Sequence, residues 1–223
     1  VASSLLAVTQ KLKFLVALRP GLLQPALAAR MTATLDRLSN GRLAINLVAG
    51  GDASELEGDG LFQDSKERYD AAGEFVDLWK DILAASYKKD EVNFDGEYYK
   101  TKGSKLLFPA VQRPHPPLFF GGSSDAAHEL AAQKVDLYIT WGEKPEDVKA
   151  KIEDVKQRAL KYGRTIRFGI RLHVIVRETE EKAWESAEEL ISKLDDETIN
   201  AAHEVLRKRE SVGQKRMADL TQG

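Results

Sequence analysis

The sequence has 223 residues, with 33 basic against 35 acidic side chains and a formal net charge of -2. A chain so nearly neutral, with 43% hydrophobic residues, is typical of a soluble globular protein and gives no electrostatic reason to expect nucleic acid or a membrane as partner. It contains no cysteine, which excludes disulfides, thiolate metal sites and cysteine nucleophiles within this sequence.

No apolar run approaches the roughly 20 residues that a membrane-spanning helix needs. The first residues, VASS, lack the basic flank and apolar core of a signal peptide, so we expect a cytoplasmic protein. The chain has no initiator methionine and opens inside what reads as the end of a helix, 3–8, with no strand before it. This start predicts a truncated N-terminus.

The first half of the chain predicts two strands, each followed by a helix. The apolar run 12–18 has the length of a parallel strand that is covered on both faces. A helix begins near Pro25, and its apolar residues at helical spacing are Ala28, Met31, Leu35 and Leu38. A second strand, 43–48, leads through a polar loop to a helix over 70–83. The face of this helix that we expect to be buried comprises Ala72, Phe75, Val76, Trp79, Ile82 and Leu83.

The second half continues the alternation after one interruption. Residues 92–108 place Asp95-Gly96 between short β-prone runs and predict an inserted hairpin. Further strands are expected at 118–120, 135–140 and 166–176, with helices at 125–133 and 145–162. A helix capped by Thr179 is expected to face inward with Ala183, Trp184, Ala187, Leu190 and Ile191. The charged stretch 195–223 reads as helical and is a candidate lid or linker.

Strands that alternate with helices indicate a parallel α/β fold. About five strands in order fall short of the eight that a closed barrel requires. The sequence therefore predicts an incomplete (β/α)8 barrel that forms a single domain over 1–223. In such barrels the functional site lies at the carboxyl ends of the strands, so polar residues just after each apolar run are the candidates.

Two glycine-rich turns stand at such positions. In Ala49-Gly50-Gly51-Asp52 the glycines allow the backbone to approach a ligand closely, although a plain tight turn uses glycine in the same way. Gly121-Gly122-Ser123-Ser124 precedes a helix and offers backbone amides, two hydroxyls and a helix N-terminus to an anion such as phosphate. A simple helix cap explains the second pattern equally well. Neither turn has Walker or Rossmann spacing.

The strand FGIRLHVIV carries a cation among apolar residues. Because side chains alternate between the two faces of a strand, Gly169, Arg171 and His173 are expected on one face. A buried guanidinium is costly unless an anion pairs with it. The anion is a ligand or, in the alternative reading, a carboxylate from a neighbouring strand.

Two aromatic residues lie near the same predicted strand ends. Tyr69 follows Glu67-Arg68 ahead of a helix, where a surface ion pair with a half-buried tyrosine is the plainer account. Trp141 is expected to form an apolar wall, unless it only packs the barrel end. The sequence has no metal-ligand spacing, no carboxylate pair and no nucleophile elbow, so metal-hydrolase and glycosidase functions have no support.

Three stretches, 14–52, 106–143 and 166–184, resemble alkanesulfonate monooxygenases of the bacterial luciferase-like superfamily. The resemblance implies a two-component system in which a separate NAD(P)H-dependent reductase supplies reduced FMN. The monooxygenase then uses O2 to cleave the carbon–sulfur bond of an alkanesulfonate, giving sulfite and an aldehyde. It also implies a homo-oligomer, a tetramer in the family.

Carried over residue by residue, the resemblance assigns Arg171 and His173 to catalysis, and Arg171 also to substrate binding, for which Trp141 is the second candidate. The residues that it places around the flavin are Ala49, Gly50, Tyr69, Gly121, Gly122, Ser123 and Ser124. Ala49 departs from relatives that often carry a hydroxyl there. The stretch 195–223 resembles the beginning of a mobile insertion that covers the site.

Two alternatives remain open from the sequence alone. One is another luciferase-like barrel that acts on a different sulfur compound or uses deazaflavin F420. The other is a flavin-binding fragment without catalysis.

Overall fold

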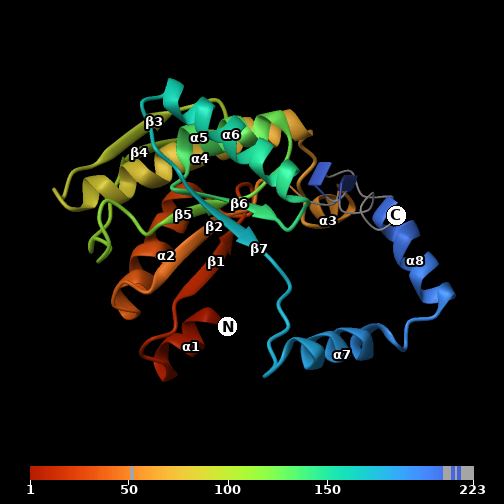
Figure 1. Ribbon diagram of the computed structural model, residues 1–223. Helices are drawn as coiled ribbons and strands as arrows, with labels where there is room; N and C mark the ends of the chain where they lie inside the picture. The colour runs from red at the N-terminus through yellow and green to blue at the C-terminus, as the bar shows by residue number, and fades with distance from the viewer. Residues whose placement is uncertain (51–52, 208–211, 214, 217–223) are drawn as a thin grey trace.

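The computed structural model describes residues 1–50, 53–207, 212–213 and 215–216 (Figure 1). Its main sheet has five parallel strands in the order β1-β2-β5-β6-β7, so each strand pairs with the next parallel strand along the chain. The strands are β1 Phe14–Leu18, β2 Leu43–Leu47, β5 Leu118–Phe120, β6 Leu137–Trp141 and β7 Arg167–Arg171. This is the strand order of a (β/α)8 barrel, and the expected incomplete barrel is confirmed.

Helices connect the strands and cover one face of the sheet (Figure 1). In chain order the helices, including α7 and α8 after the last strand, are α1 Ala2–Val8, α2 Pro25–Leu38, α3 Ala53–Gly58, α4 Ser65–Ser86, α5 Asp125–Lys134, α6 Pro145–Lys161, α7 Glu180–Ile191 and α8 Asp196–Arg207. In the covering layer α4 lies against α2 and α5, and α5 lies against α6. Most of the predicted helices and strands are therefore present within a few residues of their expected ends.

The core lies between the sheet and this helical layer. Along β2 the alternate residues Leu43, Ile45 and Leu47 are buried, whereas the residues between them are only half-buried. The predicted face of α4 is confirmed, because all six of its apolar residues are buried. The half-buried face of β2 is consequently the one that points into the open interior of the barrel.

The buried stripe of α2 differs from the expected one. Ala28 is fully buried, but Met31 and Leu38 are exposed. The helix instead buries the small and polar residues Ala29, Thr32, Ala33 and Asp36. Asp36 is there because its carboxylate accepts hydrogen bonds from the amides of Val111 and Gln112 and so anchors the segment that enters β5. Close approach of α4 favours small side chains on this face, and the longer ones are left toward solvent.

Within the stretch 92–108, where a hairpin was expected, β3 Val92–Asp95 and β4 Lys100–Ser104 form an antiparallel pair. Its turn is fixed to helix α4 by Glu74, whose carboxylate accepts hydrogen bonds from the amides of residues 97, 98 and 99. The hairpin therefore stands outside the main sheet and is tied to the helical layer.

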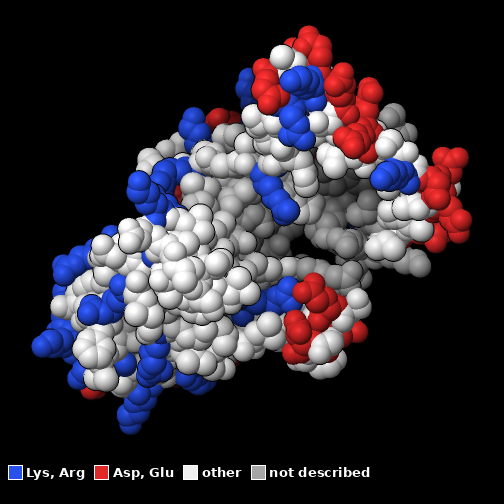
Figure 2. Space-filling view, turned by 90° about the horizontal axis from the view of Figure 1, so that it is seen from below, with Lys and Arg blue, Asp and Glu red and all other residues white. Residues whose placement is uncertain are grey.

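Two expectations for the last third of the chain are wrong. The strand expected at 166–176 ends at Arg171, and α7 buries none of its residues, so that Trp184 is 63% exposed. Both differences have one cause: β7 has a strand neighbour only on the β6 side, and α7 stands apart from the helical layer (Figure 1). Figure 2 shows a hollow between the sheet body and the separate helical segments, and acidic side chains gather on the outer surface of these segments.

The charged stretch 195–223 is helical where the structure describes it as α8. Many of the residues after α8, including 217–223, lie outside the described part of the chain. Across the described residues, no helix is both long and apolar enough to cross a membrane.

Candidate functional site

The carboxyl ends of the five strands meet at one edge of the sheet because the strands are parallel. Gly50 follows β2, Gly121 follows β5, Gly142 follows β6 and Leu172 follows β7. The predicted candidates therefore gather at the edge where barrel proteins place their functional residues.

Tyr69, at the beginning of α4, lies between the first two of these turns. Its hydroxyl oxygen would be 3.8 Å from a Cβ built on Gly50 and 3.5 Å from one built on Gly122. Its ring packs edge-on against Phe120 at a centroid distance of 6.4 Å. Ala49, in contrast, is buried in the core. The structure thus brings Gly50, Tyr69 and Gly122 together and leaves the Ala49 side chain within the packing beneath them.

Glu67 and Arg68 do not form the surface ion pair that was the plainer reading. Glu67 instead closes a capping box with Asp64 at the start of α4. Arg68 donates from its Nη1 atom to the carbonyl of Gln63, at 2.7 Å. Its buried Nε has no hydrogen-bond partner among the residues that the structure describes.

The glycines at the end of β5 are required by packing. A Cβ on Gly121 would lie 2.8 Å from the backbone oxygen of Ile139 on β6, and a Cβ on Gly122 would lie 2.6 Å from the Cβ of Ala127 on α5. The turn is therefore pressed between the neighbouring strand and the helix that follows it. This close approach fixes the direction in which the backbone amides point.

Replacing Gly121 with alanine is expected to destabilise the fold by about 1–3 kcal/mol, because a new methyl group would overlap a backbone atom that cannot rotate away. Urea unfolding measures this loss. Gly50→Ala is the matched control, since its nearest atom would be the Tyr69 hydroxyl at an ordinary contact distance of 3.8 Å. Equal stability of the two variants would contradict the packing argument.

The two serines of this turn have different partners. The hydroxyl oxygen of Ser124 caps α5 by accepting a hydrogen bond from the amide of Ala127, so the helix-cap reading holds for Ser124. The hydroxyl oxygen of Ser123 accepts a hydrogen bond from Nζ of Lys151 on α6, at 3.0 Å. Among the described residues, no acceptor contacts the amide or the hydroxyl hydrogen of Ser123. Ser123 therefore offers two hydrogen-bond donors.

Lys151 belongs to a buried ion pair that the sequence analysis missed. Its ammonium contacts the carboxylate of Glu143, just after β6, and the two side chains are only 4% and 3% exposed. A signal was present in the sequence, because Lys151 lies one helical turn from the apolar residues Val148 and Val155 on α6. A charge on the apolar face of a helix requires a partner.

A buried series of hydrogen-bonded side chains was also missed by the sequence analysis. The Tyr138 hydroxyl, on β6, donates to the carbonyl of Gly122 at 2.5 Å and lies 3.2 Å from Nε2 of His128. The other ring nitrogen of His128 lies 2.6 Å from a carboxylate oxygen of Asp154. Helix α5 places His128 on its buried face, and α6 supplies Asp154.

The surroundings of this series of side chains shift two pKa values in opposite directions. Burial, helped by the charge of Glu143, raises the pKa of the Tyr138 phenol, which therefore keeps its proton. For Asp154, partial burial raises the pKa, but hydrogen bonds from His128 and Arg158 outweigh it and lower the pKa overall. Asp154 is thus an anionic acceptor and Tyr138 a neutral donor.

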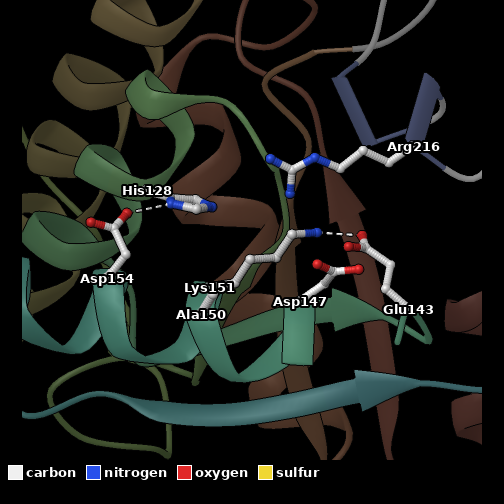
Figure 3. A pocket seen from close by; sticks show the side chains of 7 residues that line it. All are labelled: His128, Glu143, Asp147, Ala150, Lys151, Asp154 and Arg216. Carbon is white, nitrogen blue, oxygen red and sulfur yellow. Dashed lines mark hydrogen bonds and ion pairs between the residues drawn. The ribbon is translucent and has the colours of Figure 1, made fainter. Parts of the chain in front are cut away.

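A pocket of about 500 Å³ lies over these two groups (Figure 3). Its lining includes His128, Asp154, Lys151 and Glu143, with Arg216 reaching in from the short described segment near the C-terminus. The same segment lies beside the Ser123 turn, since a Cβ on Gly213 would be 3.3 Å from Ser123 Oγ and 3.6 Å from the Trp141 ring. Part of the predicted lid stretch therefore sits at this edge of the sheet.

Trp141 and Arg171 are neighbours across β6 and β7. They are paired in the strand register, and the amide of Gly142 donates to the carbonyl of Arg171 at 3.1 Å. Tyr138, on the opposite face of β6, packs toward the helices, so Trp141 and Arg171 belong to the interior face. Arg171 is exposed and forms no ion pair with any described carboxylate.

This position differs from the buried arginine that the sequence suggested, because β7 is at the edge of the sheet. The alternative of an internal carboxylate partner finds no support among the described residues. His173 lies beyond the end of β7 and is exposed, so strand geometry does not fix its direction. Within the described ranges, no group of three or more histidine, aspartate or glutamate side chains is arranged to hold a metal ion.

Part of a parallel barrel, with polar groups collected at the carboxyl ends of its strands, defines the class of barrel proteins that bind small molecules at that edge. All of residues 1–223 match the family described as luciferase-like monooxygenase. The chain therefore belongs to the luciferase-like monooxygenase family.

Solved structures show the same fold. A long-chain alkane monooxygenase, LadA, is 27% identical with a TM-score of 0.77, and the match covers 86% of this chain and 50% of that one. Riboflavin lyase, RcaE, is 23% identical with a TM-score of 0.81 over 91% of this chain and 50% of the other. EDTA monooxygenase, EmoA, from Chelativorans sp. BNC1, is 18% identical with a TM-score of 0.78 over 93% of this chain and 52% of that one. The chain spans about half the length of these proteins.

Proposed function

We propose that the chain is part of an FMNH2-dependent alkanesulfonate monooxygenase. The observation that carries the proposal is the position of Arg171, a guanidinium on the interior face of the barrel beside Trp141 that pairs with no described carboxylate. An alkanesulfonate consists of a compact anionic group and an apolar alkyl chain. A guanidinium next to an indole matches both parts of such a substrate.

The residues at the neighbouring turn fit the phosphate end of a flavin. Ser123 has two free donors among the described residues, and the N-terminus of α5 adds its dipole. Gly121 and Gly122 hold the backbone in place beneath them, and Tyr69 lies beside the turn. The structure of riboflavin lyase contains a modified FMN, which supports a flavin in this fold. Reduced FMN, when bound, supplies the electrons that activate O2.

In the proposed reaction, an alkanesulfonate, FMNH2 and O2 give an aldehyde, bisulfite, FMN and water. One oxygen atom enters the aldehyde and the other enters water, while the carbon–sulfur bond breaks and FMNH2 is oxidised. Arg171 holds the negative charge of the sulfonate. His173 orients or protonates an oxygen near the flavin, and Trp141 forms the apolar wall for the alkyl chain.

The remaining parts of the proposal concern partners and closure. A separate NAD(P)H-dependent reductase delivers the reduced flavin, and the protein acts in the cytoplasm as a homo-oligomer, as the family resemblance implies. Residues 195–223 are proposed to begin a mobile lid. The position of Gly213 against Ser123 and Trp141 supports this, since a cover at that point would exclude water from the reacting groups.

The test is sulfite release from octanesulfonate with chemically reduced FMN and O2. We expect the protein to release sulfite, with one sulfite formed for each FMNH2 oxidised in the reaction with the sulfonate. The same sample should not reduce F420. Consumption of F420 without sulfite would place the protein with a different luciferase-like oxidoreductase. Tight flavin binding with no turnover would identify a binding protein instead.

A further inference from the structure

Two buried side chains donate hydrogen bonds to the turn at residues 122 and 123. Lys151 donates to its hydroxyl oxygen at 3.0 Å. Tyr138 donates at 2.5 Å to the carbonyl of Gly122, which belongs to the same peptide group as the Ser123 amide. Each contact therefore acts on a different hydrogen-bond donor of one residue.

The Lys151 contact decides where the Ser123 hydroxyl hydrogen points. An ammonium can only donate, so it occupies a lone pair of the hydroxyl oxygen and the hydroxyl hydrogen must turn elsewhere. Glu143 holds the ammonium in place, because both partners are almost fully buried and neither can leave the other without a large penalty.

The Tyr138 contact strengthens the Ser123 amide. A carbonyl that accepts a hydrogen bond polarises its peptide group, and the N–H of that peptide becomes a better donor, by about 10–30% per bond in condensed phase. His128, held in turn by Asp154, lies against the phenol oxygen and restricts its rotation. The shorter distance to Gly122 assigns the phenol hydrogen to the carbonyl.

We propose that Tyr138 and Lys151 are positioning residues that set both donors of Ser123 toward the phosphate end of the flavin. This inference rests on the proposed function, because that function puts the phosphate at the turn. It goes further by naming the residues that make the turn selective for a flavin with a phosphate. A merely structural role would stabilise the turn without changing the preference between FMN and riboflavin.

The experiment titrates oxidised FMN and riboflavin separately into the chain and follows flavin fluorescence. Because the two ligands differ only in the phosphate, the ratio of their dissociation constants measures phosphate recognition. We expect the wild-type protein to favour FMN. Tyr138→Phe is expected to weaken FMN binding about 10-fold and leave riboflavin binding unchanged. Ser123→Ala should change the ratio in the same direction.

Tyr87→Phe is the matched control. Its hydroxyl also donates to a backbone carbonyl, that of Gln112, at 2.6 Å, but Gln112 precedes β5 and lies away from the carboxyl edge. This variant loses the same kind of hydrogen bond and should keep the wild-type ratio. A reduced ratio in both tyrosine variants would mean a general loss of stability and would overturn the inference.

The role of Lys151 must be tested in a variant that still folds. Lys151→Met combined with Glu143→Gln removes both charges together, and the inference expects the FMN preference to fall while the thermal midpoint stays near that of the wild type. An unchanged FMN preference in this double variant or in Tyr138→Phe would overturn the role of the corresponding residue.

The outcomes separate the inference from the proposed function. If sulfite is released but the wild-type protein binds FMN and riboflavin equally, the function stands and the inference fails. If FMN is preferred through Tyr138 but no sulfite appears, the inference stands and the substrate assignment fails.

Discussion

Arg171→Ala is expected to lower sulfite release about 100- to 1,000-fold, the usual cost of removing one donor that stabilises charge in a reacting complex. The fold should be unaffected, because Arg171 is exposed and pairs with no described carboxylate. Arg171→Lys should recover part of the activity, since lysine keeps the charge but loses the planar fork. Steady-state sulfite assays and circular dichroism give the two readouts.

Arg167→Ala provides the control for this prediction. Arg167 is on the same strand as Arg171, and the alternation of side chains puts both on the same face. Arg167 is the first residue of β7, however, and Arg171 is the last. Its loss should leave sulfite release close to the wild-type rate. If Arg171→Ala also released sulfite at that rate, the proposed sulfonate site would be wrong.

Glu143→Ala is expected to cost about 3–5 kcal/mol of folding free energy, because it leaves the Lys151 ammonium buried without a counter-charge. The two side chains are 3% and 4% exposed, so water reaches the place of the lost carboxylate only from the pocket that the pair lines. Urea unfolding monitored by tryptophan fluorescence measures the loss. Removing Lys151 as well, in the Lys151→Met, Glu143→Gln variant, should restore most of the stability.

The exposed pair Lys66–Asp70 is the comparison for this effect. Its side chains are 85% and 47% exposed, and pairs of this kind contribute about 0–1 kcal/mol. Lys66→Ala should therefore leave the unfolding curve almost unchanged. A Glu143→Ala variant as stable as Lys66→Ala would refute the account of a buried pair.

Much of the fold can be predicted from the sequence, because the spacing of apolar residues reflects which side chains are buried. Many side chains in the middle of the chain are buried. The face of α4 around Phe75 and Trp79 follows directly from the spacing of apolar residues. The same rule fails for α7, where Trp184 and its apolar neighbours stay exposed. Amphipathic spacing indicates that a helix has a face to bury, but it does not indicate whether a partner surface is present.

The candidate site was predictable in part. The turns after β2 and β5 could be found from glycine and serine at strand ends, since chain order alone brings parallel strand ends together. Tyr138 and His128 could not be paired in this way, because their contact depends on how α5 packs against β6. Lys151 could have been singled out as a charge in an apolar stripe, but the identity of Glu143 as its partner required the structure.

The outer edge of β7 has a consequence for how the sheet can be extended. On the side away from β6 its backbone groups have no strand partner among the described residues, and Ile170 within the strand and Leu172 after it are 49% and 57% exposed. An edge strand with unpaired backbone groups is a template on which a further strand can pair. A strand that continued the curved sheet here would enclose Arg171, so the surroundings of the proposed sulfonate site depend on what pairs with this edge.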